Sequence, residues 1–251
     1  HKDHPFFMYL PFTIPHANNE LGRSKGNGME VPDYGIYKDK DWPDTEKGFA
    51  AMVTLMDTDI GRIVSKIEQL GLAEDTIFFF SSDNGPHREG GHEPDFFDDN
   101  GPLRGIKRDL YEGGIRVPTI ARWKGRIQPG SVSDQPWAFW DFLPTAADLA
   151  GVSPPVGIDG VSIVPTLLGR DGQRQHEYVY WQVFERGFTQ ASRRQNWKAV
   201  KPGLDKPIEL YNLKEDIGEK NNIAAKHPDV VRKFEAILKN ARVDSPHFRV
   251  P

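Results

Sequence analysis

The stretch that most constrains the fold is an amphipathic segment that runs from Asp44 to Leu70. Its apolar residues are spaced by three and four positions, which predicts one long helix with Asp44 as N-cap and Gly71 at the C-terminal cap. Burial of this apolar stripe requires a sheet, and the run Thr76 to Phe80 that follows is expected to be a strand buried on both faces. The members of the stripe are Phe49, Met52, Val53, Met56, Ile60, Ile63, Val64, Ile67 and Leu70.

The segments around this helix predict an α/β arrangement. Residues 5–12 are predicted as another buried strand, so that strand, helix and strand would form a βαβ-like unit. Residues 17–42 are rich in Gly, Asn, Asp and Lys without periodicity, and they predict a long surface loop. A strand is expected at 117–123, and a helix at 137–150 that contains Pro144 and ends at Gly151.

The last third of the chain has a different pattern. Short β-like segments separated by turn residues predict a small antiparallel sheet, and a final amphipathic helix is expected at 228–242. We therefore expect an α/β domain over residues 1–172 and a small α+β subdomain over residues 173–251. The expected strands are 178–184, 188–191, 197–201 and 208–213.

Composition narrows the classes of function. A formal net charge of −4 argues against a nucleic-acid-binding or membrane-surface protein, and the absence of an eighteen-residue apolar run predicts no membrane span. The chain has no cysteine, which excludes disulfides, thiolate metal sites and a cysteine nucleophile. It begins with His1 and leads directly into a predicted strand, so we expect it to start partway through a domain.

The strand predicted at 76–80 ends in two serines and then Asp83, Asn84 and Gly85. Ligands of open α/β sheets bind beyond the carboxyl ends of strands, and adjacent Asp and Asn side chains offer oxygen ligands to a hard divalent cation. The same three residues also suit a tight turn, because Asn-Gly is a strong turn signal. Both interpretations are open at this point.

Other candidate residues lie in loops. Lys107 follows a glycine-containing turn and offers an ammonium to an oxyanion, and His16 closes the segment after the first predicted strand. Each is equally compatible with a solvated surface position. His87, His92 and Glu93 match no familiar zinc spacing and are interpreted as loop or subsite residues.

Taken in order, several segments resemble the type I, formylglycine-dependent sulfatases, the arylsulfatase-like family. They are the segment ending at His16, the Met-Asp-Thr-Asp-Ile-Gly61 run, Ser-Asp-Asn-Gly85, Leu103 to Pro118, Asp141 to Thr145, Asp159 to Ser162 and Glu209 to Leu213. The resemblance covers nearly the whole chain. It implies a partial alkaline-phosphatase-like α/β sandwich with a small C-terminal antiparallel sheet plus helix.

The resemblance also implies roles for single residues. Asp83 and Asn84 would be two ligands of a catalytic Ca²⁺, and His16 and Lys107 would be catalytic residues that contact the sulfate group. From the position of their loop beside the expected site, rather than from the resemblance, His92 is expected to bind substrate, and Asp95, Asp98 and Asp99 are expected to hydrogen-bond sugar hydroxyls. A cation, a lysine and a histidine suit this reaction, because further negative charge must be stabilised on a group that is already anionic.

The chain departs from the family pattern at the nucleophile. The formylglycine motif, Cys or Ser followed by x-Pro-x-Arg, does not occur, and Ser153 is not followed by the arginine. The family's early Asp-Asp metal ligands are also missing, and two ligands are too few for Ca²⁺. We expect this chain to be the C-terminal portion of a sulfatase whose N-terminal segment supplies the formylglycine, and to be inactive alone.

The expected function is therefore that of a sulfuric ester hydrolase that removes sulfate from a sulfated carbohydrate. The alternatives are a phosphate or phosphonate ester hydrolase of the same superfamily and a non-catalytic calcium- or glycan-binding remnant. The expected partners are a sulfated small molecule or glycan and the N-terminal segment of the same enzyme, with no nucleic acid. The resemblance implies a periplasmic or secreted location.

Overall fold

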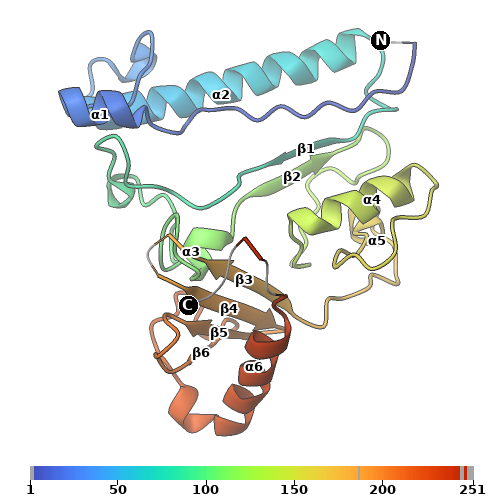
Figure 1. Cartoon of the computed structure of the whole chain (residues 1–251). Coiled ribbons are helices and arrows are strands. Elements are labelled where there is room, and N and C mark those ends of the chain that lie inside the picture. The colour runs from blue at the N-terminus through green and yellow to red at the C-terminus, as the bar shows by residue number, and fades with distance from the viewer. Residues whose placement is uncertain (1–2, 186, 244–245, 248–251) are drawn as a thin grey trace.

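The computed structural model describes residues 3–185, 187–243 and 246–247, and it arranges two antiparallel sheets in a row, with helices around them (Figure 1). The helix α2 (Asp44–Gln69) lies at one end, next to the pair β1 (Phe78–Ser81) and β2 (Thr119–Arg122). A four-stranded sheet and the helix α6 (Pro228–Asn240) lie at the other end. The shorter elements are α1 (Asn19–Lys25), η1 (Gly35–Tyr37), η2 (Pro94–Phe96), α3 (Glu112–Ile115), η3 (Phe139–Asp141), α4 (Phe142–Leu149), α5 (Val164–Leu167) and η4 (Ala224–Lys226).

The long predicted helix is confirmed as α2. Pro43 rather than Asp44 is its N-cap, and Asp44 lies in the first turn, where a carboxylate interacts favourably with the helix dipole. Leu70 is the C-cap, and Gly71 follows it in the left-handed conformation with φ of 72°. The N–H of Leu72 donates to the carbonyl of Ile67 at 3.1 Å, which closes the helix end.

The apolar stripe of α2 is less buried than expected. The buried residues of α2 are Glu46, Gly48, Ala51 and Met52, all in the first half of the helix. Of these only Met52 belongs to the stripe, and the stripe residue Val53 is 37% exposed. The predicted strand at 5–12 is wrong, because this segment pairs with no strand in the described structure, and Tyr9 in it is 77% exposed. It runs extended between α2 and the β1–β2 pair (Figure 1). The buried part of the stripe packs instead on the segment that precedes the helix, where Met52 clusters with Ala17 and Met29.

β1 is confirmed as a strand, but it is partly buried rather than buried on both faces. It pairs antiparallel with β2, with Phe78 opposite Arg122 and Ser81 opposite Thr119. The predicted βαβ-like unit is therefore wrong, since its first strand does not form. The sequence pattern correctly predicted that both segments are extended. It did not predict that only the second one pairs with another strand.

Two further predictions need correction. The predicted loop 17–42 contains α1, whose N-cap Asn18 accepts a hydrogen bond from the Leu21 N–H at 3.0 Å, and it also contains η1. The helix predicted over 137–150 begins later, as η3 followed by α4. Pro144 is the third residue of α4, within the first turn, where no N–H is needed for the intrahelical ladder.

The predicted C-terminal sheet and helix are confirmed. The strands β3 (Val179–Val183), β4 (Thr189–Arg194), β5 (Trp197–Lys201) and β6 (Glu209–Asn212) pair antiparallel in sequence order. Neighbouring residues face opposite sides, as a pleated sheet requires. Ala199 and Leu210 pack with Phe234 of α6, whereas Val200 and Tyr211 pack with Leu110 on the other face. The exact boundary at 172/173 stays a prediction.

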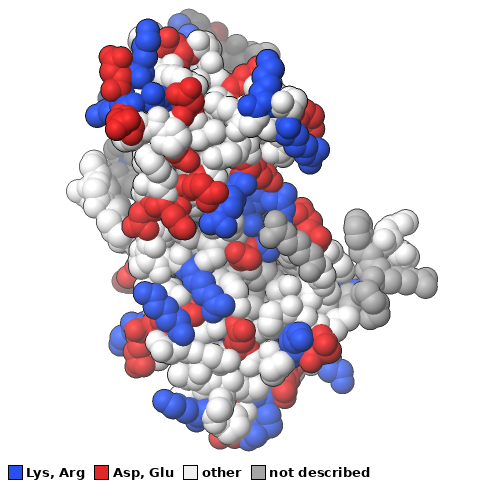
Figure 2. Space-filling model, turned by 90° about the vertical axis from the view of Figure 1, so that its left-hand side faces the viewer, with Lys and Arg blue, Asp and Glu red and all other residues white. Residues whose placement is uncertain are grey.

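The surface does not show a field of a single sign on the face drawn in Figure 2, where acidic and basic side chains are interspersed. This distribution fits the small net charge of −4. Within the part of the chain that the structure describes, no helix is both long enough and apolar enough to cross a membrane.

Candidate active site

His16 and Lys107 are brought together by the fold although 91 positions separate them. The Lys107 Nζ lies 2.9 Å from the His16 Nε2, and both contact Oε2 of Glu89, at 3.1 Å from Lys107 and 2.9 Å from His16. The His16 side chain is 43% exposed, whereas Lys107 and Glu89 are 18% and 15% exposed. The result is a partly open site with an ammonium, an imidazole and a carboxylate at one point.

The tautomer of His16 follows from its neighbours. The His16 Nδ1 lies 2.8 Å from the carbonyl oxygen of Ala17, which can only accept, so Nδ1 carries a hydrogen. The Nε2 then accepts from Lys107 in the neutral ring, or donates to Glu89 when the ring is protonated. The Nε2 of His16 therefore lies at the position where Lys107 and Glu89 meet.

Glu89 is held by cations on both of its oxygens. Its Oε1 lies 2.8 Å from Arg108, which also contacts Glu185. Arg108 has φ of 82°, a left-handed conformation that is rare for a residue with a side chain. Burial alone would raise the pKa of the Glu89 carboxyl, but the hydrogen bonds from Arg108 and Lys107 outweigh burial and lower it to about 2. Glu89 is therefore ionised at neutral pH.

His87 lies beneath this group and is only 8% exposed. Its Nε2 donates to the carbonyl of Pro15 at 3.2 Å, and its Nδ1 accepts the N–H of Glu89 at 3.1 Å. Burial lowers the pKa of His87, so the ring is neutral, as these two hydrogen bonds require. His87 thereby fixes the backbone next to both His16 and Glu89.

Asp83 and Asn84 follow the end of β1. The Ser82 hydroxyl donates to the Asn84 carbonyl at 2.9 Å, and the Gly85 N–H donates to the Gly114 carbonyl at 3.0 Å. Asp83 is exposed and Asn84 is half-buried. In residues 3–185, 187–243 and 246–247, no group of three or more His, Asp or Glu side chains is placed to hold a metal ion. The two oxygens suit Ca²⁺ in kind, but their number falls short of its usual six to eight ligands.

His92, expected to bind substrate, is fully buried with 0% exposure. Its Nδ1 lies 2.7 Å from Glu46 and its Nε2 lies 2.7 Å from Asp99, and the ring stacks on Phe49 at 3.7 Å. Burial tends to lower the pKa of His92, but the carboxylates of Asp99 and Glu46 outweigh it and raise the pKa. Both ring nitrogens thus face carboxylates, and these contacts tie α2 to the loop before η2; the expected substrate-binding role of His92 stays a prediction.

Sequence reasoning did not single out Glu89 or Arg108. Glu89 precedes two glycines and is typical of a turn, and Arg108 follows Lys107 as an ordinary basic residue. Their meeting depends on backbone contacts between distant loops, such as the Lys107 N–H that donates to the Pro86 carbonyl at 2.7 Å. No local pattern in the sequence encodes that contact.

Two family models match the chain. The family model described as "Sulfatase" matches residues 1–152, and a model described as "N-sulphoglucosamine sulphohydrolase, C-terminal" matches residues 105–244. The chain belongs to the sulfatase family. The resemblance noted from the sequence is thereby confirmed.

Individual relatives agree with this assignment. A protein named "Sulfatase" from Formosa agariphila is 35% identical over 90% of this chain and 43% of its own length. An N-acetylgalactosamine-6-O-sulfatase from Bacteroides thetaiotaomicron is 28% identical over 96% of this chain and 48% of its own length. The chain thus spans less than half of each of these two relatives.

Solved structures establish the fold. The crystal structure of Ps i-CgsB in complex with k-i-k-neocarrahexaose superposes with a TM-score of 0.77 at 26% identity, over 93% of this chain and 50% of that one. The chain forms part of the alkaline-phosphatase-like α/β fold of sulfatases, as expected, together with the small C-terminal antiparallel sheet and helix. A phosphonate monoester hydrolase of Agrobacterium radiobacter shares this fold, with a TM-score of 0.60 at 22% identity.

Proposed function

We propose that the protein containing this chain hydrolyses sulfate esters of a sulfated carbohydrate. The observation that carries the proposal is the contact of His16 and Lys107 at 2.9 Å, in a partly open site. Membership of the sulfatase family supports the reaction class. The N-acetylgalactosamine-6-O-sulfatase relative and the neighbour bound to neocarrahexaose support a carbohydrate substrate.

In this proposal the chain's own residues bind and neutralise the sulfate group. The Lys107 ammonium contacts a sulfate oxygen as a point charge, and the His16 Nε2, once protonated, donates to the same group. Charge that develops on the transferring group in the transition state is met by donors that are already in place, which is the main source of catalysis in such sites. Glu89 orients Lys107 and His16 through the contacts at 3.1 and 2.9 Å.

Two groups outside this chain's own side chains complete the proposal. Asp83 and Asn84 would supply two oxygen ligands to Ca²⁺, which as a bound cation polarises the sulfate oxygens. The nucleophile, expected as formylglycine, is not among these residues, since the chain has no cysteine and no Ser-x-Pro-x-Arg. We therefore propose that an N-terminal segment of the same enzyme supplies it and that residues 1–251 alone do not turn over substrate. On the separate ground of the family resemblance, we propose that the enzyme is periplasmic or secreted.

The alternative of a phosphate or phosphonate ester hydrolase follows from the fold shared with the phosphonate monoester hydrolase. The two functions differ in which ester, sulfate or phosphate, the enzyme hydrolyses faster. Rates on a sulfated sugar and on the matching phosphorylated sugar separate them in one assay. A protein that binds calcium or sugar but hydrolyses neither ester would establish the third reading, a non-catalytic remnant.

The test uses the full-length protein and two single variants. We expect Lys107→Ala and His16→Ala to lower kcat on the sulfate ester by roughly a hundredfold or more while the fold is kept. The exposed Lys124, replaced by alanine, is the matched control and should retain wild-type turnover. A folded Lys107→Ala or His16→Ala variant with unchanged turnover would reject that residue's role. Chelation by EDTA should abolish turnover, and added Ca²⁺ should restore it.

A further inference from the structure

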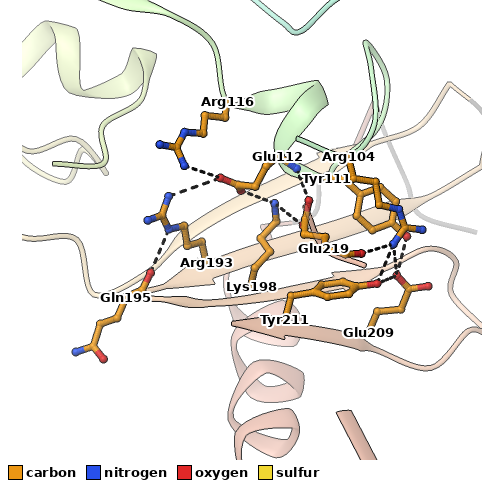
Figure 3. A network of polar contacts seen from close by, with 10 residues as sticks. All are labelled: Arg104, Tyr111, Glu112, Arg116, Arg193, Gln195, Lys198, Glu209, Tyr211 and Glu219. Atoms are coloured by element: carbon orange, nitrogen blue, oxygen red, sulfur yellow. Dashed lines mark hydrogen bonds and ion pairs between the residues drawn. The ribbon is translucent and has the colours of Figure 1, made fainter. Parts of the chain in front are cut away.

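A buried ion-pair group joins the region of the site to the C-terminal sheet. The Lys198 Nζ of β5 lies 2.8 Å from Glu112 Oε1 of α3 and 3.5 Å from Glu219 Oε1 in the loop after β6 (Figure 3). The side chains of Lys198 and Glu219 are 0% exposed, and Glu112 is 2% exposed. Removing such charges from water is costly, and breaking a buried pair by removing one partner leaves an uncompensated charge, so the three side chains depend on one another.

The contacts converge on Glu112. Its Oε2 faces Arg193 at 3.8 Å and Arg116 at 3.9 Å, and its backbone N–H donates to Glu219 at 2.6 Å. Glu219 has φ of 49°, a strained conformation, and its Oε1 accepts no hydrogen bond in the described structure, leaving only the ion pair to Lys198. The group thus fixes both the side chain and the backbone at the start of α3.

A second set of contacts holds the segment just before α3. The Arg104 guanidinium donates to the Tyr211 hydroxyl at 3.0 Å and to the Glu219 carbonyl at 3.0 Å, and it lies 3.7 Å from the centre of the Tyr111 ring. The Tyr111 hydroxyl donates to Glu209 at 2.6 Å. Both ends of the segment 104–111, which contains Lys107, are therefore attached to the C-terminal sheet and the loop after it (Figure 3).

The first turn of α3 in turn contacts both loops of the candidate site. The Gly113 N–H donates to the Arg104 carbonyl at 2.7 Å, and a Cβ at Gly113 would lie 2.2 Å from the Gly105 carbonyl oxygen. The Gly114 carbonyl accepts the Gly85 N–H at 3.0 Å, next to Asp83 and Asn84. This packing leaves no room for a side chain, so a displacement of α3 displaces both loops.

We propose that Glu112, Lys198 and Glu219 are positioning residues, by which the C-terminal sheet fixes the two loops that present Lys107 and the Asp83–Asn84 pair. The kinetic part of this inference rests on the proposed sulfatase function, and the structural part does not. Since a misplacement of about 1 Å can reduce turnover on the order of a hundredfold, such residues affect rate without touching substrate.

The experiment compares amide hydrogen exchange and turnover in the full-length protein. Lys198→Met removes the ammonium, and Glu112→Gln keeps the shape but removes one charge. The matched control is Phe234→Leu, which weakens the opposite, α6-facing side of the same sheet, where Phe234 is 2% exposed. We expect the amides of Gly85, Lys107 and Gly113 to exchange roughly tenfold faster or more in both network variants and at the wild-type rate in Phe234→Leu.

Turnover gives the second readout, at a temperature well below unfolding. We expect kcat to fall roughly tenfold to a hundredfold in the network variants, with a smaller change in KM, and to remain near wild type in Phe234→Leu. Unchanged exchange at these three amides in folded Lys198→Met and Glu112→Gln overturns the inference. An equal increase of their exchange rates in Phe234→Leu overturns it too. If the wild-type protein hydrolyses no sulfate ester, the proposed function fails, and the exchange comparison alone decides the positioning role.

Discussion

Glu89 offers the sharpest test of the candidate site, because one carboxylate is shared by three basic side chains. We consider the substitution Glu89→Gln, which keeps the shape and removes the charge. In the wild type, Glu89 Oε2 lies 2.9 Å from His16 and 3.1 Å from Lys107, and its Oε1 lies 2.8 Å from Arg108. Glutamine keeps one acceptor oxygen in place of two, and it cannot balance the charge of these donors.

The magnitude follows from the pKa of Glu89. A fall from 4.5 to about 2 corresponds to about 3 kcal/mol of the free energy of unfolding at neutral pH, at about 1.36 kcal/mol per pH unit. Since Arg108 is 26% exposed and His16 is 43% exposed, water screens part of this interaction. We therefore expect Glu89→Gln to lose about 1–2 kcal/mol.

The sign of the pH dependence is fixed by the lowered pKa. The contribution of Glu89 is fully present above the unfolded-state value of 4.5 and is lost as the pH falls towards about 2. Urea unfolding of the wild type and Glu89→Gln at pH 7, 5, 4 and 3 should show a difference that is constant at first and shrinks below 4.5. The control Glu93→Gln removes an exposed ion pair with Arg88 in the same loop and should cost less than about 1 kcal/mol. Equal stability at pH 7, or a difference that does not shrink in acid, would refute the reasoning.

Two further predictions concern stability. Gly85→Ala should cost more than about 2 kcal/mol in thermal unfolding, because its Cβ would lie 1.8 Å from the Gly113 carbonyl oxygen. Gly61→Ala, in open space within α2, should instead gain about 0.5–1 kcal/mol, and similar effects at both glycines would contradict this. His92, whose pKa is raised, contributes stability that is fully present below its ordinary value of 6.5 and is lost as the pH rises through its folded-state pKa. The stability of the wild type relative to His92→Gln should therefore fall as the pH rises above 6.5, and a difference that stays constant with pH would contradict this.

The sequence was informative where structure depends on local pattern. α2 follows from apolar spacing, and β3 to β6 follow from short β-rich segments between turns, because neighbours in the chain are also neighbours in space. The segment 5–12 has the same β-rich composition, yet it is no strand, since a strand also needs a partner that composition does not supply. For the same reason, composition did not predict that β1 and β2 pair antiparallel.

For the candidate site, the resemblance paired His16 with Lys107, and the structure places their nitrogens 2.9 Å apart. Their catalytic roles, like the metal roles of Asp83 and Asn84, stay predictions. Glu89 escaped notice because its partners come from residues 16, 107 and 108, which no local pattern connects. In the sequence, His92 lies in a polar loop, where a histidine is a plausible ligand-binding residue. Only the fold shows that its two ring nitrogens contact Glu46 and Asp99.

The attachment of α3 to the C-terminal sheet has a consequence for how the protein is made. Glu112 precedes Lys198 by 86 residues and Glu219 by 107, so a ribosome that adds about 5–20 residues per second needs roughly 5–20 s to supply these partners. During that interval Asp83, Asn84 and Lys107 have been synthesised, while the sheet proposed to order their loops has not. A product that ends within β3 to β6 would retain every one of these residues and still lack an ordered site.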